Sequence, residues 1–405
     1  MKIALVCPAS LPATQFGGIL FLFVDIAKES SNCGHDVTIY TTDLDFANNP
    51  KTFNKNLPRV ETVDNFKIKR THVWLASHLF FVNPGIYFQM MKDCPDIIHT
   101  IGVRSFQSYI AAIVAKKKKI PLIVSDQGGL TTHPELKKGS MLKRFLYKLQ
   151  APMIRYVINQ ATKIIVANEY EKQIFLSKEI GLKEKVGSLD NESKITVIRN
   201  GIDLEILNQK ATDFKKKYGI NKKFFLFVGR FAKVKGLDIL LQAMNSIKNQ
   251  SELENMQLVI MGVDFGFESE MVRMIKNFKL DRKITVIKNP LREDVITAYQ
   301  ESEFLVLPSR WELSPLTPLE GFAFKKPVIS TDAHGIPSTI TDGENGILVE
   351  NENFAELGQA IIKLSEDKNK RMKYGLAGYN LVKKECNSIK MVKHTLDIYK
   401  KTING

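Results

Sequence analysis

Short apolar runs alternate with longer amphipathic segments along most of this chain, and this alternation restricts the possible fold more than any other feature. The runs have the length of buried strands, and the segments between them have the length of helices. Repeated in the order strand, helix, strand, the pattern predicts an α/β protein with parallel sheets. The predicted strands span residues 2–7, 36–40, 96–99, 121–125, 163–167, 194–198, 224–228, 257–262, 284–287, 304–307, 327–330 and 346–349.

The length of the chain indicates more than one domain. At 405 residues it is long for a single hydrophobic core. A basic and polar stretch with little pattern, at residues 213–221, interrupts the alternation. We therefore expect a boundary between residues 1–205 and residues 206–385. Each part would be a Rossmann-like domain with a parallel sheet, and the two would face each other across a cleft.

Composition indicates the cellular compartment in which the protein works. Apolar residues make up 44% of the chain and charged residues 25%, as in ordinary globular proteins. The four cysteines are scattered without a CxxC pair, which fits a reducing compartment and argues against a zinc site or a disulfide framework. No apolar run approaches the roughly 20 residues of a membrane-spanning helix, and the first run is too short for a signal peptide. We expect a cytoplasmic protein.

The net charge of +15, from 58 basic and 43 acidic residues, favours anionic partners such as phosphorylated substrates, anionic lipid or nucleic acid. The absence of a zinc-finger, RRM or basic coiled-coil signature argues against nucleic acid. Residues 137–160 mix basic and apolar side chains. They fit two structures: a helix lying on an anionic membrane surface at the inner face of the cell membrane, or an amphipathic helix packed on its own domain.

Residues 308–320 carry two glutamates eight positions apart, with a predicted helix start between them. Ser314 is a suitable N-cap, and Pro315 suits the first helical position. Glu312 then falls in the loop before the helix, and Glu320 falls about two turns into it. The arrangement predicts two carboxylates near the end of the strand at 304–307.

The start of this predicted helix is a candidate anion site. The unpaired N–H groups of Leu316 and Thr317, together with the helix dipole, would face the end of the strand. Carboxylates on either side, from Glu312 and Glu320, can bind hydroxyl groups. Phosphate plus hydroxyl groups describes a sugar nucleotide. The alternative is a common strand–loop–helix unit with two solvated glutamates.

A second strand-to-helix loop places two cations, Arg230 and Lys235, after Gly229. Arginine offers a planar fork for phosphate oxygens, and lysine a compact point charge. Both would emerge at the sheet edge that carries Glu312 and Glu320. Cations fixed there can stabilise a departing diphosphate in place of a metal ion. The alternative is a pair of solvated cations.

Two features near the N-terminus are weaker. Gly17 and Gly18 precede the first predicted helix, where glycine lets backbone approach a ligand closely; the alternative is that they only shape a turn. Asp43 and Asp45 form a DxD pattern, which in some glycosyltransferases holds a divalent cation. We favour a surface loop there over a metal site.

The end of the strand at 121–125 is another candidate site. Ligands in open α/β sheets bind at the carboxyl ends of strands. Asp126 and Gln127 follow this strand directly, and His133 lies close behind them.

Taken together, these motifs resemble the large retaining GT-B glycosyltransferases of family 4 (group 1). The likeness covers nearly the whole chain and is strongest from about residue 195 to residue 350. Each motif is weak alone, but their order and spacing are specific. They are Asn-Gly-Ile-Asp at 200–203, Gly-Arg at 229–230, Lys-Gly at 235–236, the E-x7-E pattern at 312–320, Pro-Val-Ile at 327–329 and Asp-Gly-Glu-Asn-Gly at 342–346.

The resemblance implies roles for the donor-side residues. Arg230 and Lys235 would contact the donor diphosphate. Glu320 would bind the ribose hydroxyls, and Glu312 the hydroxyls of the transferred sugar. The donor-binding set is completed by Gly229, Leu316 and Thr317, with Gly17 and Gly18 reaching the donor phosphate from the other domain.

The resemblance also implies the division of labour. Residues 1–205 would bind the acceptor, residues 206–385 the nucleotide sugar, and the helix at 386–405 would pack back on the N-terminal domain. Catalysis would retain anomeric configuration and need no metal or other cofactor. The substrates would be a nucleotide sugar and a glycan or lipid-linked acceptor, as in polysaccharide or glycolipid biosynthesis.

The sequence departs from the family on the acceptor side. Many members carry a functional histidine in the loop after the strand at 121–125, where this chain has Gln127. Asp126 and His133 are candidate substitutes, and the alternative is that the reaction needs no such group. His99 keeps only the first histidine of a frequent H-x-H pattern. We expect a hexosyltransferase, with a non-catalytic nucleotide-sugar-binding module or a sugar-nucleotide epimerase as alternatives.

Overall fold

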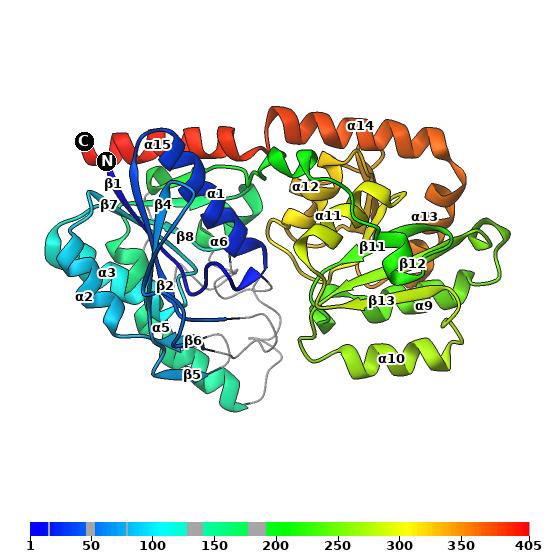
Figure 1. The fold of residues 1–405 in the computed structure, drawn as a ribbon, viewed down its shortest axis with the longest axis horizontal. Helices are drawn as coiled ribbons and strands as arrows, with labels where there is room; N and C mark the ends of the chain where they lie inside the picture. The colour runs from blue at the N-terminus through cyan, green and yellow to red at the C-terminus, as the bar shows by residue number, and fades with distance from the viewer. Residues whose placement is uncertain (15–16, 46–52, 78–79, 128–140, 177–191, 405) are drawn as a thin grey trace. The chain divides into compact units, whose positions relative to one another are not determined.

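The computed structural model describes residues 1–14, 17–45, 53–77, 80–127, 141–176 and 192–404, except for the side chains of residues 77 and 141–149. The chain forms two compact units, Met1–Asn200 with Ser388–Gly405, and Gly201–Asn387 (Figure 1). The units divide after residues 200 and 387, and the sequence placed the boundaries after residues 205 and 385. The N–H of Ile202 donates to the carbonyl of Cys386 at 3.0 Å, which ties the residues after 200 to the second unit.

Among the described residues of the first unit, eight strands form one sheet in the order β10-β9-β8-β7-β1-β2-β4-β3. Neighbouring strands are parallel except β3 and β4, which form an antiparallel pair at one edge. The strands are β1 (Lys2–Val6), β2 (Asp36–Thr42), β3 (Val60–Val63), β4 (Phe66–Thr71), β7 (Ile97–Ile101), β8 (Leu122–Ser125), β9 (Lys163–Val166) and β10 (Ile195–Val197). β3 and β4 lie outside the predicted set, because they mix apolar residues with polar or charged ones, whereas the prediction relied on continuous apolar runs.

A short hairpin of β5 (Leu75–Ser77) and β6 (Phe80–Val82) follows β4. Apolar residues of β1, β2 and α1 share one core cluster with Met391, Val392, Leu396 and Tyr399 of the C-terminal helix, so that helix lies alongside α1 in the first unit (Figure 1). The helices are α1 (Gly18–Asn32), α2 (Gly85–Asp93), α3 (Phe106–Lys118), α5 (Met141–Gln160), α6 (Glu169–Leu176) and α15 (Ser388–Asn404).

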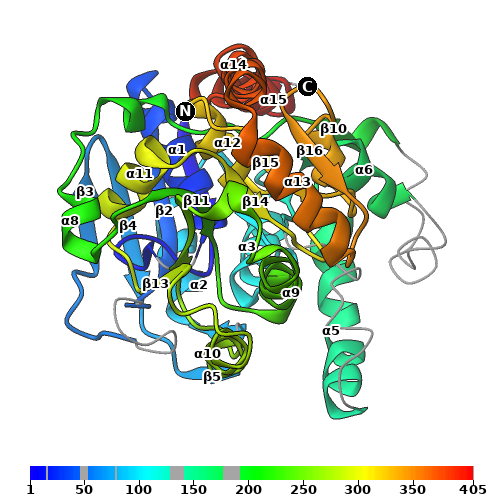
Figure 2. The ribbon, with the colours of Figure 1, turned by 90° about the vertical axis from the view of Figure 1, so that its right-hand side faces the viewer.

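The second unit, described without a gap, is built on one six-stranded parallel sheet in the order β13-β12-β11-β14-β15-β16. Helices cover both of its faces (Figure 2). The strands are β11 (Lys223–Val228), β12 (Met256–Gly262), β13 (Ile284–Lys288), β14 (Leu305–Leu307), β15 (Val328–Thr331) and β16 (Gly346–Val349). The helices are α8 (Phe214–Tyr218), α9 (Leu237–Ile247), α10 (Glu268–Asn277), α11 (Arg292–Glu301), α12 (Leu316–Ala323), α13 (Phe354–Glu366) and α14 (Lys368–Lys384).

The strand order of the second unit positions its site. From β11 the chain moves outward to β12 and β13, and then returns to place β14 on the other side of β11. The chain therefore changes direction between β11 and β14, and the loops that follow these two strands emerge side by side. Such a switch point is where open α/β sheets bind ligands.

Candidate functional site

Lys235 and Glu312 come from the two loops that meet at this switch point. Lys235 ends a 3-10 turn after β11, and Glu312 lies in the loop between β14 and α12. The backbones approach so closely that a Cβ on Gly236 would lie 1.8 Å from the carbonyl oxygen of Pro308, and Gly236 also has a φ of +70°. Only glycine satisfies both conditions, and this close approach brings the two side chains together.

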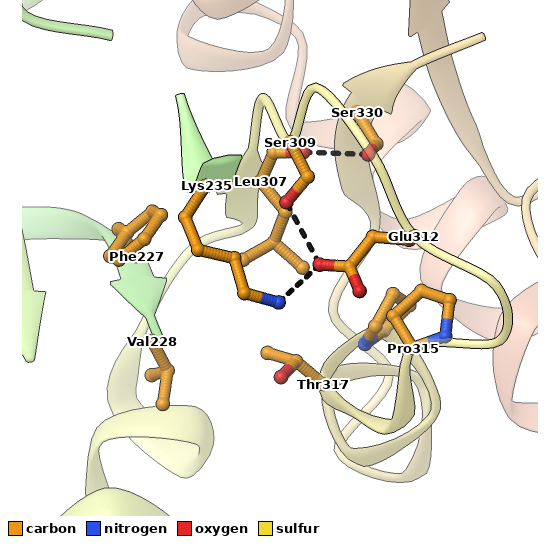
Figure 3. Close-up of a pocket in the computed structure, with 10 residues that line it drawn as sticks. Phe227, Val228, Lys235, Leu307, Ser309, Glu312, Pro315, Thr317 and Ser330 are labelled. Atoms are coloured by element: carbon orange, nitrogen blue, oxygen red, sulfur yellow. Dashed lines mark hydrogen bonds and ion pairs between the residues drawn. The ribbon is translucent and has the colours of Figure 1, made fainter. Parts of the chain in front are cut away.

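The Lys235 ammonium forms an ion pair with Oε1 of Glu312. The Ser309 hydroxyl donates to the same oxygen at 3.0 Å (Figure 3). The two charged side chains are 20% and 15% exposed, respectively. A cation and a carboxylate are thus held together at a half-buried position, where an incoming charged ligand would feel both.

A pocket with about 300 Å³ of empty space, part of it open to solvent, surrounds this pair. Figure 3 shows Lys235, Glu312 and Thr317 around it. Its lining residues are Phe227, Val228, Lys235, Leu307, Ser309, Glu312, Pro315, Thr317, Pro318 and Ser330. The pocket joins the end of β11, the end of β14 and the first turn of α12, as the sequence predicted for an anion site.

The start of α12 differs from the prediction by one residue. Pro315, and not Ser314, is the N-cap, with a β-region backbone and without a side-chain cap. Leu316 is the first helical residue, so Pro318 still falls in the first turn, where the missing N–H costs little. The N–H groups of Leu316 and Thr317 belong to the first turn, which has no intrahelical acceptors for them.

Glu320 lies further along α12 and does not line the pocket. Its Oε1 accepts a 2.6 Å hydrogen bond from Nη2 of Arg292, and its Oε2 accepts a 2.7 Å bond from the hydroxyl of Tyr299. Burial, followed by the charge of Glu320, raises the pKa of Tyr299 well above its ordinary value. The carboxylate is therefore fixed in orientation by two residues of α11.

The Arg230 side chain, in the loop that follows β11, stacks on an aromatic ring. Its guanidinium lies 4.9 Å from the centre of the Phe265 ring. The preceding residue, Gly229, donates its N–H to the carbonyl of Met261 at 3.0 Å. A Cβ on Gly262 would meet the Gly229 carbonyl oxygen at 1.8 Å, so glycine is needed where β11 and β12 end.

In the first unit, Gly17 and Gly18 stand at the start of α1. Gly17 is the N-cap with a φ of +109°, and Gly18 is the first helical residue. The conformation of Gly17 is one that glycine adopts readily. The N-terminus of α1 follows β1 at the carboxyl edge of its sheet.

His99 is a buried core residue. The prediction that it lies on the acceptor side as a site residue is therefore wrong. The hydroxyl of Tyr399 on α15 lies 2.5 Å from its Nδ1, and the hydroxyl of Ser125 lies 2.8 Å from its Nε2. Burial lowers the pKa of His99 to about 3. With both ring nitrogens engaged inside the core, His99 joins β7 to β8 and to the C-terminal helix.

Asp126 and Gln127 directly follow the carboxyl end of β8. The buried carboxylate of Glu171 on α6 lies close to both. Glu171 accepts from the backbone N–H of Gln127 at 3.1 Å and of Ala167 at 2.6 Å. Burial, with a smaller contribution from the charge of Asp126, raises the pKa of Glu171 to about 7. The Gln127 side-chain amide exchanges two hydrogen bonds with that of Asn200, at 2.9 and 3.0 Å. His133 lies outside the described residues.

The DxD pattern was interpreted as a surface loop, and for Asp43 this is wrong. Its side chain is fully buried. It binds His72 and the backbone N–H of Val73, because Asp43 directly follows β2 and these two residues directly follow its parallel neighbour β4. Asp45 accepts a hydrogen bond from the side chain of Asn54 at 3.1 Å.

The segment at 137–160 contains α5, whose described second half packs on its own unit. Ile154, Val157 and Ile158 are buried there, and the ring of Tyr156 lies 5.5 Å from that of Tyr109 on α3. Residues 137–140 lie outside the described part of the chain. Within the part that is described, no helix combines the length and apolarity required to cross a membrane.

Several residues of the site were not predicted. Ser309, Arg292 and Tyr299 contact the two glutamates directly. Ser309 carried a usable signal, since it lies three residues before Glu312. Arg292 and Tyr299 carried none, because their contact with Glu320 depends on how α11 packs beside α12.

Comparison with known proteins adds two family models, which together span most of the chain. Residues 16–206 match the model described as Glycosyltransferase Family 4, and residues 209–381 match Glycosyl transferases group 1. The meeting point of the two models lies near the division between the two units.

Individual relatives have low sequence identity to this chain but align over most of its length. An uncharacterized glycosyltransferase of Methanocaldococcus jannaschii is 28% identical over 69% of this chain and 68% of its own length. Spore coat protein SA of Bacillus subtilis is 26% identical over 99% of this chain and 100% of its own. Among solved structures, the Anabaena protein HepE in complex with UDP-glucose has a TM-score of 0.76 at 17% identity, covering 99% of this chain and 100% of that one.

Proposed function

This chain belongs to the group 1 glycosyltransferases with a GT-B fold, and on that premise we propose that it moves a sugar from a nucleotide-diphosphate sugar to a hydroxyl of a glycan or lipid-linked acceptor, with retention of anomeric configuration. The observation that carries the proposal is the Lys235–Glu312 pair beside the first turn of α12. It sets a cation, a carboxylate and helix N–H groups around one pocket.

The donor diphosphate is assigned to Lys235, Arg230 and the N-terminus of α12. Phosphate oxygens accept hydrogen bonds from the N–H groups of Leu316 and Thr317. Their negative charge is attracted by the two cations. Glu312 is assigned to hydroxyls of the transferred sugar, because its carboxylate lines the same pocket. Glu320, oriented by Arg292 and Tyr299, is assigned to the ribose hydroxyls, as the family likeness implies.

In the proposed reaction, the bond between the sugar's anomeric carbon and the diphosphate oxygen breaks, and a bond to the acceptor oxygen forms on the same face. The acceptor's proton passes to an oxygen of the departing diphosphate. Lys235 and Arg230 stabilise the negative charge that grows on the diphosphate during this step. A fixed cation of this kind contributes on the order of 10² to 10³ in rate.

We propose further that the reaction needs no metal ion. The support is positive: the two cations are placed in the loop that follows β11, at the sheet edge where the diphosphate is assigned. Turnover that survives EDTA without loss supports this assignment. Activity that vanishes with EDTA and returns with manganese contradicts it.

The alternatives make different products. A non-catalytic binding module binds the nucleotide sugar but releases no nucleotide when an acceptor is added. An epimerase forms an epimeric sugar nucleotide without any acceptor. The family assignment favours transfer over both.

The test has two stages. UDP, GDP and ADP, and then their sugars, are screened by thermal shift; UDP is first because the structurally similar HepE is known in complex with UDP-glucose. Acceptor-dependent release of the bound nucleotide is then compared between wild type, Lys235→Ala and Lys276→Ala, the last changing an exposed lysine on α10. We expect roughly a 10² to 10³-fold loss for Lys235→Ala alone. Equal activity in all three proteins would refute the assignment.

Location in the cytoplasm with reversible attachment to an anionic membrane surface is part of the proposal. Its support is the net charge of +15 and the basic, apolar sequence at 137–149, which precedes the part of α5 that packs on its own unit. Flotation with liposomes should increase with their anionic lipid content. Flotation that does not depend on anionic lipid counts against it.

A further inference from the structure

The carboxyl edge of the sheet in the first unit carries an aspartate–histidine pair that the proposed chemistry does not use. β2 and β4 are parallel neighbours with Thr42 opposite Thr71. Asp43 and His72 directly follow these two residues, so the strand register places them side by side. This edge is the one at which an open parallel sheet binds its ligand.

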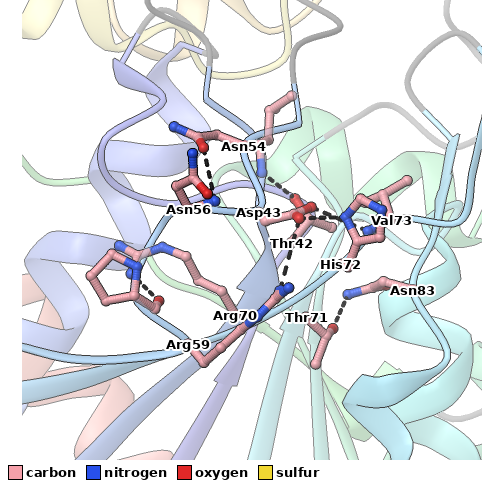
Figure 4. A network of polar contacts seen from close by, with 12 residues as sticks. Thr42, Asp43, Asn54, Asn56, Arg59, Arg70, Thr71, His72, Val73 and Asn83 are labelled. Carbon is pink, nitrogen blue, oxygen red and sulfur yellow. Dashed lines mark hydrogen bonds and ion pairs between the residues drawn. The ribbon is translucent and has the colours of Figure 1, made fainter.

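The pair fixes the orientation of the His72 ring. Nδ1 of His72 lies 2.5 Å from Oδ2 of Asp43, and an ionised carboxylate only accepts, so Nδ1 carries the hydrogen. Asp43 is itself held by the Val73 N–H, 3.1 Å from Oδ1, and by the Arg59 guanidinium, 3.8 Å from Oδ2 (Figure 4). Nε2 of His72 is the ring nitrogen that remains for a ligand, on a side chain that is 28% exposed.

Trp74 follows His72 by two residues. Val73 is buried, whereas His72 is half-buried and Trp74 is 75% exposed. His72 and Trp74 therefore flank a buried residue, and both side chains are accessible to solvent. The Trp74 backbone is anchored, because its N–H donates to the carbonyl of Val82 at 2.8 Å.

The base of the β5–β6 hairpin is locked to the sheet by a buried polar chain. The Asn83 side chain donates to the Thr71 hydroxyl at 2.8 Å (Figure 4). Gln107 of α3 donates to the Asn83 oxygen at 2.6 Å. Both amide side chains are fully buried. The Trp74 indole is therefore carried by a rigid part of the backbone. Binding sites need such rigid support for the side chains that contact the ligand.

We propose that Trp74 and His72 form a subsite for a sugar ring of the acceptor, and the proposal rests on the glycosyl transfer proposed above. An exposed, anchored indole offers a flat apolar face to the C–H side of a pyranose. The oriented Nε2 forms a hydrogen bond with a ring hydroxyl, which can donate or accept, and this bond supplies direction and specificity. The acceptor class is thus a glycoside or a glycan, with recognition of a ring and not of a lipid chain alone.

The test uses the fluorescence of Trp74 in the full chain without donor. The chain has two tryptophans, and the other, Trp311, is 8% exposed, so acrylamide quenching reports mainly Trp74. Methyl and p-nitrophenyl glycosides of common hexoses and N-acetylhexosamines are titrated at millimolar concentration. We expect at least one glycoside to protect the indole from acrylamide, and Trp74→Phe should remove this signal.

Variants separate the subsite from the donor chemistry. For the glycoside that protects Trp74, we expect His72→Ala and Trp74→Ala to weaken binding and raise the acceptor KM roughly tenfold or more. Donor-only nucleotide release should stay unchanged. Phe88→Ala, which removes an exposed aromatic ring on α2, serves as the matched control and should behave as wild type.

A failure of the sugar subsite can be told apart from a failure of the proposed glycosyl transfer. Fluorescence protection needs no donor, so it tests the subsite even if no transfer is detected. The proposal is overturned if no glycoside protects Trp74 while anionic phospholipid vesicles do, which would make the hairpin a membrane contact. It is equally overturned if Trp74→Ala keeps the wild-type acceptor KM.

Discussion

Arg310 holds Asp238 with two parallel hydrogen bonds, Nη1 to Oδ1 at 2.7 Å and Nη2 to Oδ2 at 2.9 Å. This fork joins the loop after β14 to the first turn of α9. A further 2.7 Å bond runs from Nη1 to the carbonyl of Lys233. Although burial opposes it, the Arg310 and Lys233 charges lower the pKa of Asp238. The clamp spans the two loops that carry Lys235 and Glu312, so it sets their separation.

The first prediction concerns this clamp. Arg310→Lys keeps the charge but loses the planar fork, so one oxygen of the largely buried Asp238 loses a charged partner. We expect a loss of about 2 kcal/mol in the free energy of unfolding, together with a fall in transfer activity. Chemical denaturation and nucleotide release measure the two effects. Arg273→Lys, at an exposed position on α10, is the control; equal stability of both variants would contradict the role given to the clamp.

The second prediction separates backbone strain from steric clash at Gly236. Gly236→Ala meets both a φ of +70° and the Pro308 carbonyl, whereas Gly343→Ala meets a φ of +73° with open space around the new Cβ. We expect a cost of about 1 kcal/mol at Gly343 and more than about 3 kcal/mol at Gly236. The comparison of the two melting temperatures checks this. A similar cost at both positions would mean that the loops can move apart.

The third prediction concerns the support of Glu320. Tyr299→Phe removes the hydroxyl that donates to Oε2 and leaves that oxygen to find another donor. Bonds to charged groups contribute about 1.5–3 kcal/mol, so we expect lower stability and several-fold weaker nucleotide binding. Calorimetric titration with the nucleotide found by thermal shift measures the affinity. Tyr374→Phe alters another buried tyrosine of the same unit and should leave the affinity unchanged; a matching loss there would show a general packing effect.

The fourth prediction is a pH dependence from His99. Burial holds its pKa near 3, below the ordinary value of about 6.5. The unfolded chain therefore binds a proton that the folded chain does not between these values, and the stability from neutral His99 is present above pH 6.5 and is lost as pH falls. Between pH 7 and 4.5 this group should remove about 2–3 kcal/mol of unfolding free energy.

The measurement compares wild type and His99→Gln by denaturant unfolding at pH 7 and pH 4.5. The stability difference between them should narrow at the lower pH by that amount, because glutamine does not titrate. His394→Gln, at an exposed position on α15, is the control. A difference that stays constant with pH would show that His99 can protonate in place.

Local sequence patterns were enough to predict the α/β class, the parallel strands and the donor-side loops. The reason is that apolar runs, glycines and helix caps act over a few residues, and parallel strands must end at a common edge. They placed Lys235 and Glu312 at one edge of the sheet, and in the structure the two side chains form an ion pair.

Pairings between residues far apart in the chain were beyond those patterns. His99 became a core residue because Tyr399, 300 positions later, reaches its ring. Asp43 became a buried partner of His72 because β2 pairs with β4. Tyr299 and Arg292 reached Glu320 only through the packing of α11 beside α12. Strand order and helix packing bring such residues together, and neither is written in the spacing of neighbouring residues.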